Sequence, residues 1–219
     1  MVPLIELVLA AVPVIALGIF SGGSGSGNGE TRKKDRSGYL VRRAKEGDSS
    51  AFEELFHMYQ QRLYFSVIRI VLNHEDANDV VQESFIKAYK NLDTFKEEFR
   101  FYTWLYRIAV NTALNFVQQS RHKEDSLDGL YSDKRFDPKM DQDIDQEVLH
   151  SEMIHRVKDA LEFIPPDMRT VFIMRVYEEL SYKEIAETLD ISIGTVMSRL
   201  HRARSMLKSR LVKTGWYQD

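Results

Sequence analysis

Apolar residues recur every three or four positions in two separate segments of this sequence, 39–122 and 149–213. That spacing places them on one face of an α-helix, whereas a half-buried β-strand would need strict alternation. The pattern breaks down between the two segments, at 123–148, where acidic residues outnumber basic ones. Because no apolar face can form there, we expect this stretch to be a flexible acidic linker. The sequence therefore predicts an all-α fold of two small helical domains joined by that linker.

Composition narrows the classes of function that this chain can serve. Of its 219 residues, 43% are hydrophobic and 29% are charged, which is typical of a globular protein with a core. Because it has no cysteine, it can form no disulfide and no thiolate metal site, and we expect a cytoplasmic protein. The six histidines include no His-Glu-x-x-His pair, and no glycine-rich phosphate loop is present. We therefore expect no enzyme, no catalytic residue, no metal and no cofactor.

The N-terminal segment has a composition of its own. Residues 1–20 form an apolar leader with a single charge, Glu6, and residues 21–38 are first rich in glycine and serine and then basic. About twenty apolar residues just span a bilayer, and the basic cluster would keep the rest of the chain on the cytoplasmic side. Three readings stay open for the leader: a membrane anchor that tethers the protein, an over-extended translation start, or a fusion remnant. Residues 21–38 are expected to be a linker.

The pattern from Tyr39 to His122 is helical throughout, and three helices are expected after a turn at Gly47. A cap at Asp48 or Ser49 starts the first helix, Asn73 starts the second, and the third begins after Phe99. The apolar stripe of the second helix comprises Ala77, Val80, Val81, Ser84, Phe85 and Ala88. Such stripes should pack together as the core of the first domain.

The second domain, 149–213, carries local signals for short helices. Ser181 and Glu184 form a Ser-x-x-Glu capping box, and Ser192 caps a final helix after a tight turn. The inner face of that final helix is formed by Val196, Leu200, Ala203 and Leu207. A short helix and a long basic helix around a tight turn are typical of a helix-turn-helix, and residues 214–219 follow as a tail.

The final helix is strongly basic, although the net charge of the whole chain is −3. Between Ile193 and Lys213 there are six lysines and arginines and no acidic residue. A helix that reads DNA presents its first turns to base edges and its basic side chains to bases and phosphates. The candidates for contact with DNA are Thr195, Met197, Ser198, Arg199, His201, Arg202 and Arg204. The alternative is a solvated basic helix, stabilised by its own dipole.

Aromatic residues gather between positions 95 and 106, interleaved with Arg100 and followed by Arg107, Asn111 and Asn115. The aromatic residues are Phe95, Phe99, Phe101, Tyr102, Trp104 and Tyr106. Aromatic rings with nearby cations and amides suit unstacked bases, because a base can stack on a ring while the amides read its edge. The alternative is an aromatic-rich helical core in which Phe101 and Trp104 only pack.

Four strings in these two segments carry a resemblance to a known family. The first two, NDVVQESFIKAYKNL (78–92) and FYTWLYRIAVNTA (101–113), resemble region 2 of the extracytoplasmic-function sigma factors of the sigma-70 family. The second pair resembles region 4 of the same proteins, with LSYKEIAETL at 180–189 and GTVMSRLHRAR at 194–204. The resemblance identifies 39–122 as a sigma region 2 domain and 149–213 as a sigma region 4 helix-turn-helix domain.

The resemblance implies a promoter-specificity subunit of RNA polymerase, without catalysis of its own. Its expected partners are core RNA polymerase, promoter DNA and an anti-sigma factor. By resemblance, the clamp coiled coil of the polymerase β′ subunit would be bound by Asp79, Gln82 and Glu83. The melted −10 element would be held by Lys87, Phe95, Trp104, Arg107, Asn111 and Asn115, while the final helix of region 4 would lie over the −35 element. Met197 departs from the basic residue that relatives often have there, which leaves the −35 sequence open.

A second class of function stays open at this point. A free-standing helix-turn-helix regulator would use the same final helix but would bind duplex DNA tightly without polymerase. A sigma factor alone should bind its promoters poorly.

Overall fold

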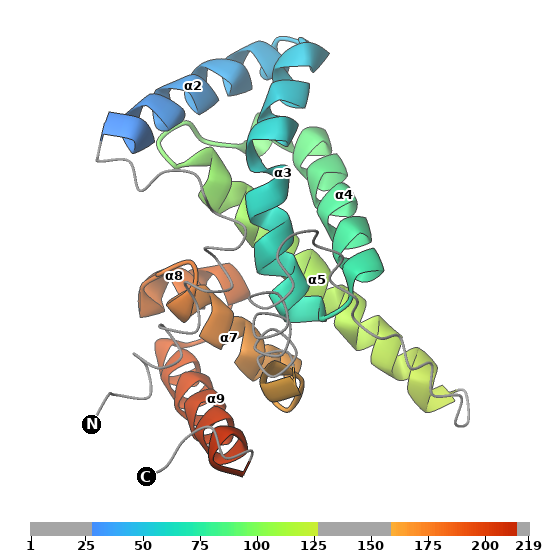
Figure 1. The fold of residues 1–219 in the computed structure, drawn as a ribbon. Helices are drawn as coiled ribbons and strands as arrows, with labels where there is room; N and C mark the ends of the chain where they lie inside the picture. Colours follow the sequence, from blue (N-terminus) through green and yellow to red (C-terminus); the bar gives the residue numbers. More distant parts are fainter. Residues whose placement is uncertain (1–27, 127–158, 214–219) are drawn as a thin grey trace, which may run out of the picture. The chain divides into compact units, whose positions relative to one another are not determined.

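The computed structural model of the protein describes residues 28–126 and 159–213, which fall into two compact units (Figure 1). Every regular element within these two ranges is helical, which confirms the all-α prediction. The apolar leader at 1–20, the tail at 214–219 and most of the acidic linker lie outside the described residues. In the part of the chain that is described, no helix is long and apolar enough to cross a membrane.

The first unit is built from four α-helices and a short 3₁₀ turn. In chain order these are α2 (Asn28–Lys45), α3 (Ser49–Val71), α4 (His74–Lys90), η1 (Leu92–Thr94) and α5 (Phe101–Ser126). Helices α3, α4 and α5 pack against one another, and α2 packs mainly on α3 (Figure 1). The apolar stripes of these helices meet in one core. The six residues predicted to face inward from α4 are its buried residues.

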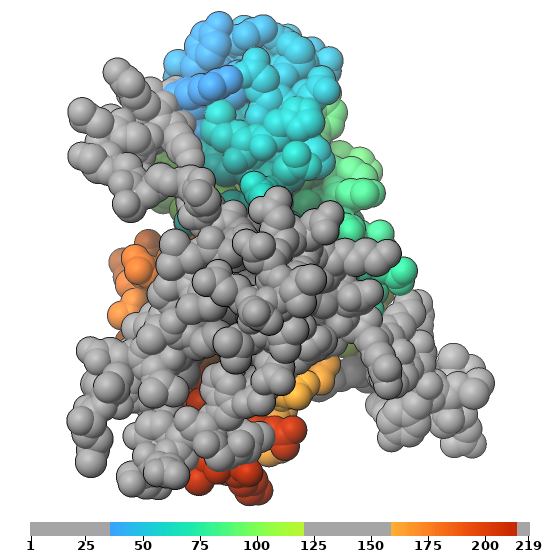
Figure 2. All heavy atoms as spheres, viewed as in Figure 1, coloured from blue at the N-terminus to red at the C-terminus, as the bar shows by residue number. Residues whose placement is uncertain are grey.

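Helix α2 begins earlier than the sequence predicts. It starts at Asn28, inside the 21–38 segment that was expected to be a linker. Ser37 is 3% exposed, and its hydroxyl lies 2.5 Å from the hydroxyl of Tyr59 on α3. In the space-filling view the blue atoms of α2 lie directly against the cyan atoms of α3 (Figure 2). Packing on α3 therefore stabilises a helical turn whose own sequence has no apolar stripe.

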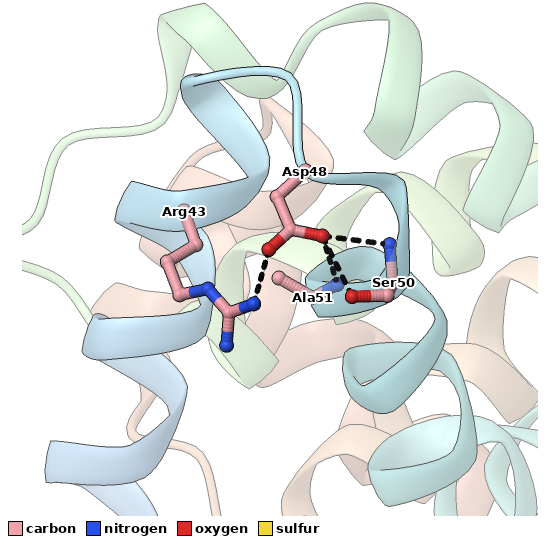
Figure 3. A network of polar contacts seen from close by, with 4 residues as sticks. All are labelled: Arg43, Asp48, Ser50 and Ala51. Carbon is pink, nitrogen blue, oxygen red and sulfur yellow. Dashed lines mark hydrogen bonds and ion pairs between the residues drawn. The ribbon is translucent and has the colours of Figure 1, made fainter.

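The turn between α2 and α3 is held by a carboxylate. Gly47 adopts φ +94, a left-handed conformation that a residue with a Cβ would reach only with strain. Asp48 then caps α3, since its Oδ1 accepts hydrogen bonds from the backbone N–H of Ser50 at 3.0 Å and of Ala51 at 3.3 Å (Figure 3). The Ser50 hydroxyl donates to the same oxygen at 2.7 Å, and Arg43 of α2 pairs with Oδ2. The Ser50 hydroxyl, the Ala51 amide and the Arg43 guanidinium together lower the pKa of Asp48.

We expect Asp48→Ala to lower the thermal midpoint of unfolding, and to lower it more at neutral pH than in acid. Because the folded-state pKa of Asp48 is depressed, the charge-dependent part of its stabilisation is present above the ordinary aspartate value of about 3.9 and is lost as the pH falls through the lower, folded value. Thermal unfolding followed by circular dichroism, at neutral pH and in acid, measures the difference. Asp48→Asn keeps the capping oxygen without the charge, so it should fall between the two. A deficit in Asp48→Ala that stays equally large in acid contradicts this reading.

Within 159–213, the described part of the second unit, one helical turn at 159–162 is followed by three helices. These are α7 (Pro166–Val176), α8 (Tyr182–Leu189) and α9 (Ile193–Lys213). The predicted capping box at the start of α8 is confirmed: the Glu184 backbone N–H donates to the Ser181 hydroxyl at 3.2 Å, and the Ser181 backbone N–H donates to the Glu184 carboxylate at 2.8 Å. Asp190 ends α8 in the left-handed region at φ 52 and sends the chain into α9. Helices α8 and α9 therefore form the predicted helix-turn-helix, which packs on α7.

The acidic segment begins inside a helix. Helix α5 continues to Ser126, beyond the boundary of 122 predicted for the first domain. Residues 121–126 are mostly charged or polar and include no glycine or proline, so nothing in them ends the helix. Only the part of the acidic segment after 126 lies outside the described residues.

Candidate nucleic-acid and polymerase interfaces

One face of α4 is acidic and points away from the core. Asp79, Gln82 and Glu83 are all exposed, and their spacing of three and four residues places them together on the helix surface. The neighbouring positions Val80 and Val81 are buried, so the outward direction of this face is fixed by the core. The structure thus gathers the three residues predicted to bind polymerase on one side of one helix.

Lys87 links that acidic face to α5. Its Nζ pairs with the Glu83 carboxylate at 2.7 Å and donates a hydrogen bond to the Thr112 hydroxyl of α5 at 3.2 Å. Arg107, Asn111 and Asn115 of α5 are all exposed and lie four residues apart, so they form one polar stripe. Lys87 therefore stands where α4 meets the helix that carries the other polar residues predicted to contact the −10 element.

The aromatic residues divide into a buried group and an exposed ring. Phe95 is only 4% exposed, and its ring centroid lies 5.6 Å from that of Phe101 and 5.4 Å from that of Trp104. Lys45 of α2 closes over it, donating from Nζ to the Phe95 carbonyl at 2.7 Å. Phe99 is 59% exposed in the turn before α5, whereas Trp104 is half-buried. Phe95 and Phe101 are therefore core residues, as the alternative of an aromatic-rich helical core describes.

Phe99 was not among the residues that the sequence singled out for the −10 element. The pattern alone could not separate it from its aromatic neighbours. One signal was available: Lys96, Glu97, Glu98 and Arg100 surround it, and such a run of charges indicates an exposed turn.

The first turns of α9 combine residues held in place with residues left open. The Ser192 hydroxyl caps the helix, accepting from the Thr195 backbone N–H at 3.0 Å and lying 2.8 Å from the Thr195 hydroxyl. The Ser198 hydroxyl donates to the Thr195 carbonyl at 3.0 Å. The hydroxyls of Thr195 and Ser198 therefore both make hydrogen bonds within the start of α9. Met197 is 55% exposed, and His201 and Arg202 are also exposed.

Arg199 and Arg204 differ from these neighbours because both are half-buried. The Arg199 Nε lies 3.2 Å from Oδ2 of Asp167, in the first turn of α7. The sequence did not predict this pair, because the two residues are distant in the chain and no local pattern joins them.

The described residues offer no centre for metal chemistry. Within 28–126 and 159–213, no group of three or more histidine, aspartate or glutamate residues could hold a metal ion. What both units present instead is polar and aromatic side chains on helix surfaces, an arrangement suited to binding macromolecules.

Comparisons with known proteins agree with both units. Residues 55–123 match the family model described as Sigma-70 region 2, and residues 154–207 match Sigma-70, region 4. An extracytoplasmic-function (ECF) RNA polymerase sigma-E factor of Haemophilus influenzae is 41% identical over 177 residues, covering 78% of this chain and 93% of that protein. An RNA polymerase sigma-H factor of Pseudomonas aeruginosa is 37% identical over 187 residues, covering 83% of this chain and 95% of that protein.

Solved structures show the same fold. The structure of CnrH in complex with the cytosolic domain of CnrY aligns with a TM-score of 0.58 and 25% identity, over 81% of this chain and 98% of CnrH. The sigma factor RpoE of Bartonella quintana, solved with the anti-sigma factor NepR, aligns with a TM-score of 0.59 and 24% identity, over 73% of this chain and 96% of that chain.

Proposed function

This chain belongs to the extracytoplasmic-function sigma factors of the sigma-70 family, and we propose that its two units divide the work of promoter recognition between the −10 and −35 elements. The observation that carries the proposal is the likeness to the sigma-E factor, because it extends over 177 residues and includes both units. The protein is a sigma factor in transcription initiation.

We propose that the acidic face of α4 docks on the clamp coiled coil of the polymerase β′ subunit. Asp79 and Glu83 are exposed carboxylates on a helix whose opposite side is buried in the core. An acidic face of this kind complements a basic partner, and such pairs fix orientation as well as affinity. Core RNA polymerase is therefore the first partner we assign.

The second assignment concerns the melted −10 element, which we place on the α5 side of the first unit. Flipping a base out of the duplex costs a few kcal/mol, which stacking and edge contacts must offset. Arg107, Asn111 and Asn115 supply a polar stripe for the strand, and Lys87 adds a cation beside it. Trp104 and the exposed Phe99 are the candidates for stacking, and the buried Phe95 packs against Trp104.

We expect Phe99→Ala to weaken the binding of single-stranded −10 DNA by about 5- to 150-fold, because stacking is worth ~1–3 kcal/mol per base. Fluorescence anisotropy with a labelled oligonucleotide, in the presence of core polymerase, measures the loss. Tyr39→Ala is the matched control, since Tyr39 of α2 is also an exposed ring, at 52%. Equal losses in the two variants, or none in either, would contradict a stacking role for Phe99.

The −35 element is assigned to the first turns of α9. Met197, His201 and Arg202 are exposed on the second helix of the helix-turn-helix, which is the helix that enters the major groove in such motifs. Arg199 lies between them in the sequence, and its side chain is held by an ion pair with Asp167 of α7.

An anti-sigma protein is the third partner that we assign. CnrH, which shares the fold at 25% identity, was solved bound to the cytosolic domain of another protein, CnrY. An anti-sigma protein that covers the exposed faces of α4 or α9 would block polymerase or DNA and so keep this factor inactive.

A gel shift with and without core polymerase tests the proposal against a free-standing regulator. Duplex promoter DNA should be retarded strongly only when both the protein and core polymerase are present. If about four basic residues contact phosphates, the logarithm of the affinity should fall with the logarithm of the salt concentration at a slope of roughly −3.6. Tight, sequence-specific retardation by the protein alone would favour the regulator instead.

A further inference from the structure

We propose that Asp167 of α7 is a positioning residue, which sets the pose in which Arg199 meets a base of the −35 element. The inference rests on the proposed function, because it assumes that α9 lies in the major groove. Its starting point is the ion pair between Nε of Arg199 and Oδ2 of Asp167, which are 3.2 Å apart. The two side chains are 29% and 44% exposed, so both are partly open to solvent at the surface of the unit.

Asp167 is well placed to hold a side chain still. It lies in the first turn of α7, directly after Pro165 and Pro166, whose rings fix the backbone at that helix start. The next residues along α7, from Arg169 to Met174, are buried, so the turn that carries the carboxylate is anchored in the core. A negative charge is also favoured at the positive end of a helix. The carboxylate therefore belongs to a rigid element, which is what a supporting residue requires.

The Arg199 side chain is held against α7 by its ion pair with Asp167. Met197, Ser198, His201 and Arg202 are exposed, but Arg199 leans toward α7, and α7 and α9 are packed together. An unrestrained arginine loses side-chain entropy when it binds, and a restrained one has already lost part of it. Among the described residues Arg202 makes no ion pair, so it suits an adaptable contact with phosphate, whereas Arg199 suits a fixed contact.

The atom that makes the contact decides what Arg199 can read. The closest contact of Asp167 is with Nε, the guanidinium nitrogen nearest to the backbone of Arg199. The terminal nitrogens Nη1 and Nη2 lie farther out along the side chain. A pair of guanidinium N–H groups matches O6 and N7 of guanine in the major groove, the commonest specific contact of arginine with DNA. We therefore assign to Arg199 a guanine of the −35 element, and to Asp167 the orientation of the guanidinium toward it.

The test measures promoter preference with core polymerase and the full chain. Templates carry each of the four bases at each −35 position, and run-off transcripts are quantified for the parent, Arg199→Ala, Asp167→Asn and the double variant. Arg199→Ala should remove the preference for guanine at one position. Asp167→Asn should reduce the preference at that same position by about 5- to 10-fold, within the range of one arginine–guanine contact. The double variant should be no worse than Arg199→Ala, because both changes remove one contact.

Two further variants separate positioning from stability. Asp167→Glu keeps the carboxylate and should restore part of the guanine preference, which a change in folding would not do. Glu187→Gln is the control, since it breaks the exposed pair of Lys183 and Glu187, 3.9 Å apart on α8, and should leave every preference unchanged. Thermal unfolding of each variant is measured alongside.

Three outcomes overturn the inference. In the first, Arg199→Ala removes a preference while Asp167→Asn leaves it intact, so that the proposed function stands and Asp167 has no positioning role. In the second, Asp167→Asn lowers transcription equally from all templates, as a merely structural residue would. In the third, Arg199→Ala changes no preference although transcription still depends on the −35 sequence. If core polymerase with the unaltered protein gives no promoter-dependent transcript, the proposed function itself has failed, which is a distinct outcome.

Discussion

Reversing two charges on α4, in the variant Asp79→Lys with Glu83→Lys, should lower the affinity for core RNA polymerase by about 100-fold or more. Each change replaces an attraction to a basic partner with a repulsion, and contacts between paired charges at interfaces are among the most sensitive to such changes. The fold should be unaffected, because both side chains are exposed and the core face of α4 lies on its other side. Titration of labelled protein with core polymerase, followed by anisotropy, measures the affinity.

The control for this variant is Glu53→Lys, which reverses an exposed carboxylate on α3, where the side chain is 72% exposed. It alters the net charge in the same direction but leaves the α4 face intact, so its affinity for polymerase should stay within a few-fold of the parent. If Glu53→Lys weakens binding as much as the α4 variant does, only long-range charge is at work and the assignment of this face is wrong.

Leu200→Ala should unfold the second unit and leave the first one working. Leu200 is 2% exposed on α9, and removing a buried leucine side chain costs about 2–5 kcal/mol. A unit this small has little stability to spare, because short chains bury a smaller share of their surface. Transcription that depends on the −35 element should therefore be lost. Binding of single-stranded −10 DNA in the presence of core polymerase should persist within a few-fold, because the first unit has a core of its own.

Met197→Ala is the matched control on the same helix. Met197 is 55% exposed, so truncating it should leave the thermal unfolding of the second unit unchanged while altering the preferred −35 sequence. Loss of −10 DNA binding in Leu200→Ala, in parallel with the loss of −35 function, would mean that the two units do not fold independently.

Local signals in the sequence predicted most of the helices. The buried stripe of α4 and the capping box of α8 were both correct, because each depends on residues three or four positions apart. Spacing of this kind is fixed by helix geometry alone. The same holds for Ser192, whose hydroxyl caps α9 through contacts within one turn.

Features that depend on tertiary packing escaped prediction. No apolar stripe in the sequence indicates the early start of α2 at Asn28, and the burial of Ser37 depends on its packing against Met58 and Tyr59 of α3. Phe95 and Phe99 are the same residue type in the same aromatic run, yet Phe95 lies in the core and Phe99 is exposed. The ion pair between Arg199 and Asp167 joins two helices, so it depends on how α7 and α9 pack and not on any motif. Of these residues, the resemblance supplied roles for Phe95 and Arg199, but not their contacts.

Run-off transcription with purified core polymerase tests the central claim most directly. The template carries a promoter from the organism's own genome, and the −10 and −35 elements are replaced one at a time. We predict a transcript only when the protein and core polymerase are both present, and its loss when either element is replaced. A transcript that core polymerase makes equally well without the protein, or the absence of any promoter-dependent transcript from a library of genomic fragments, would contradict the account.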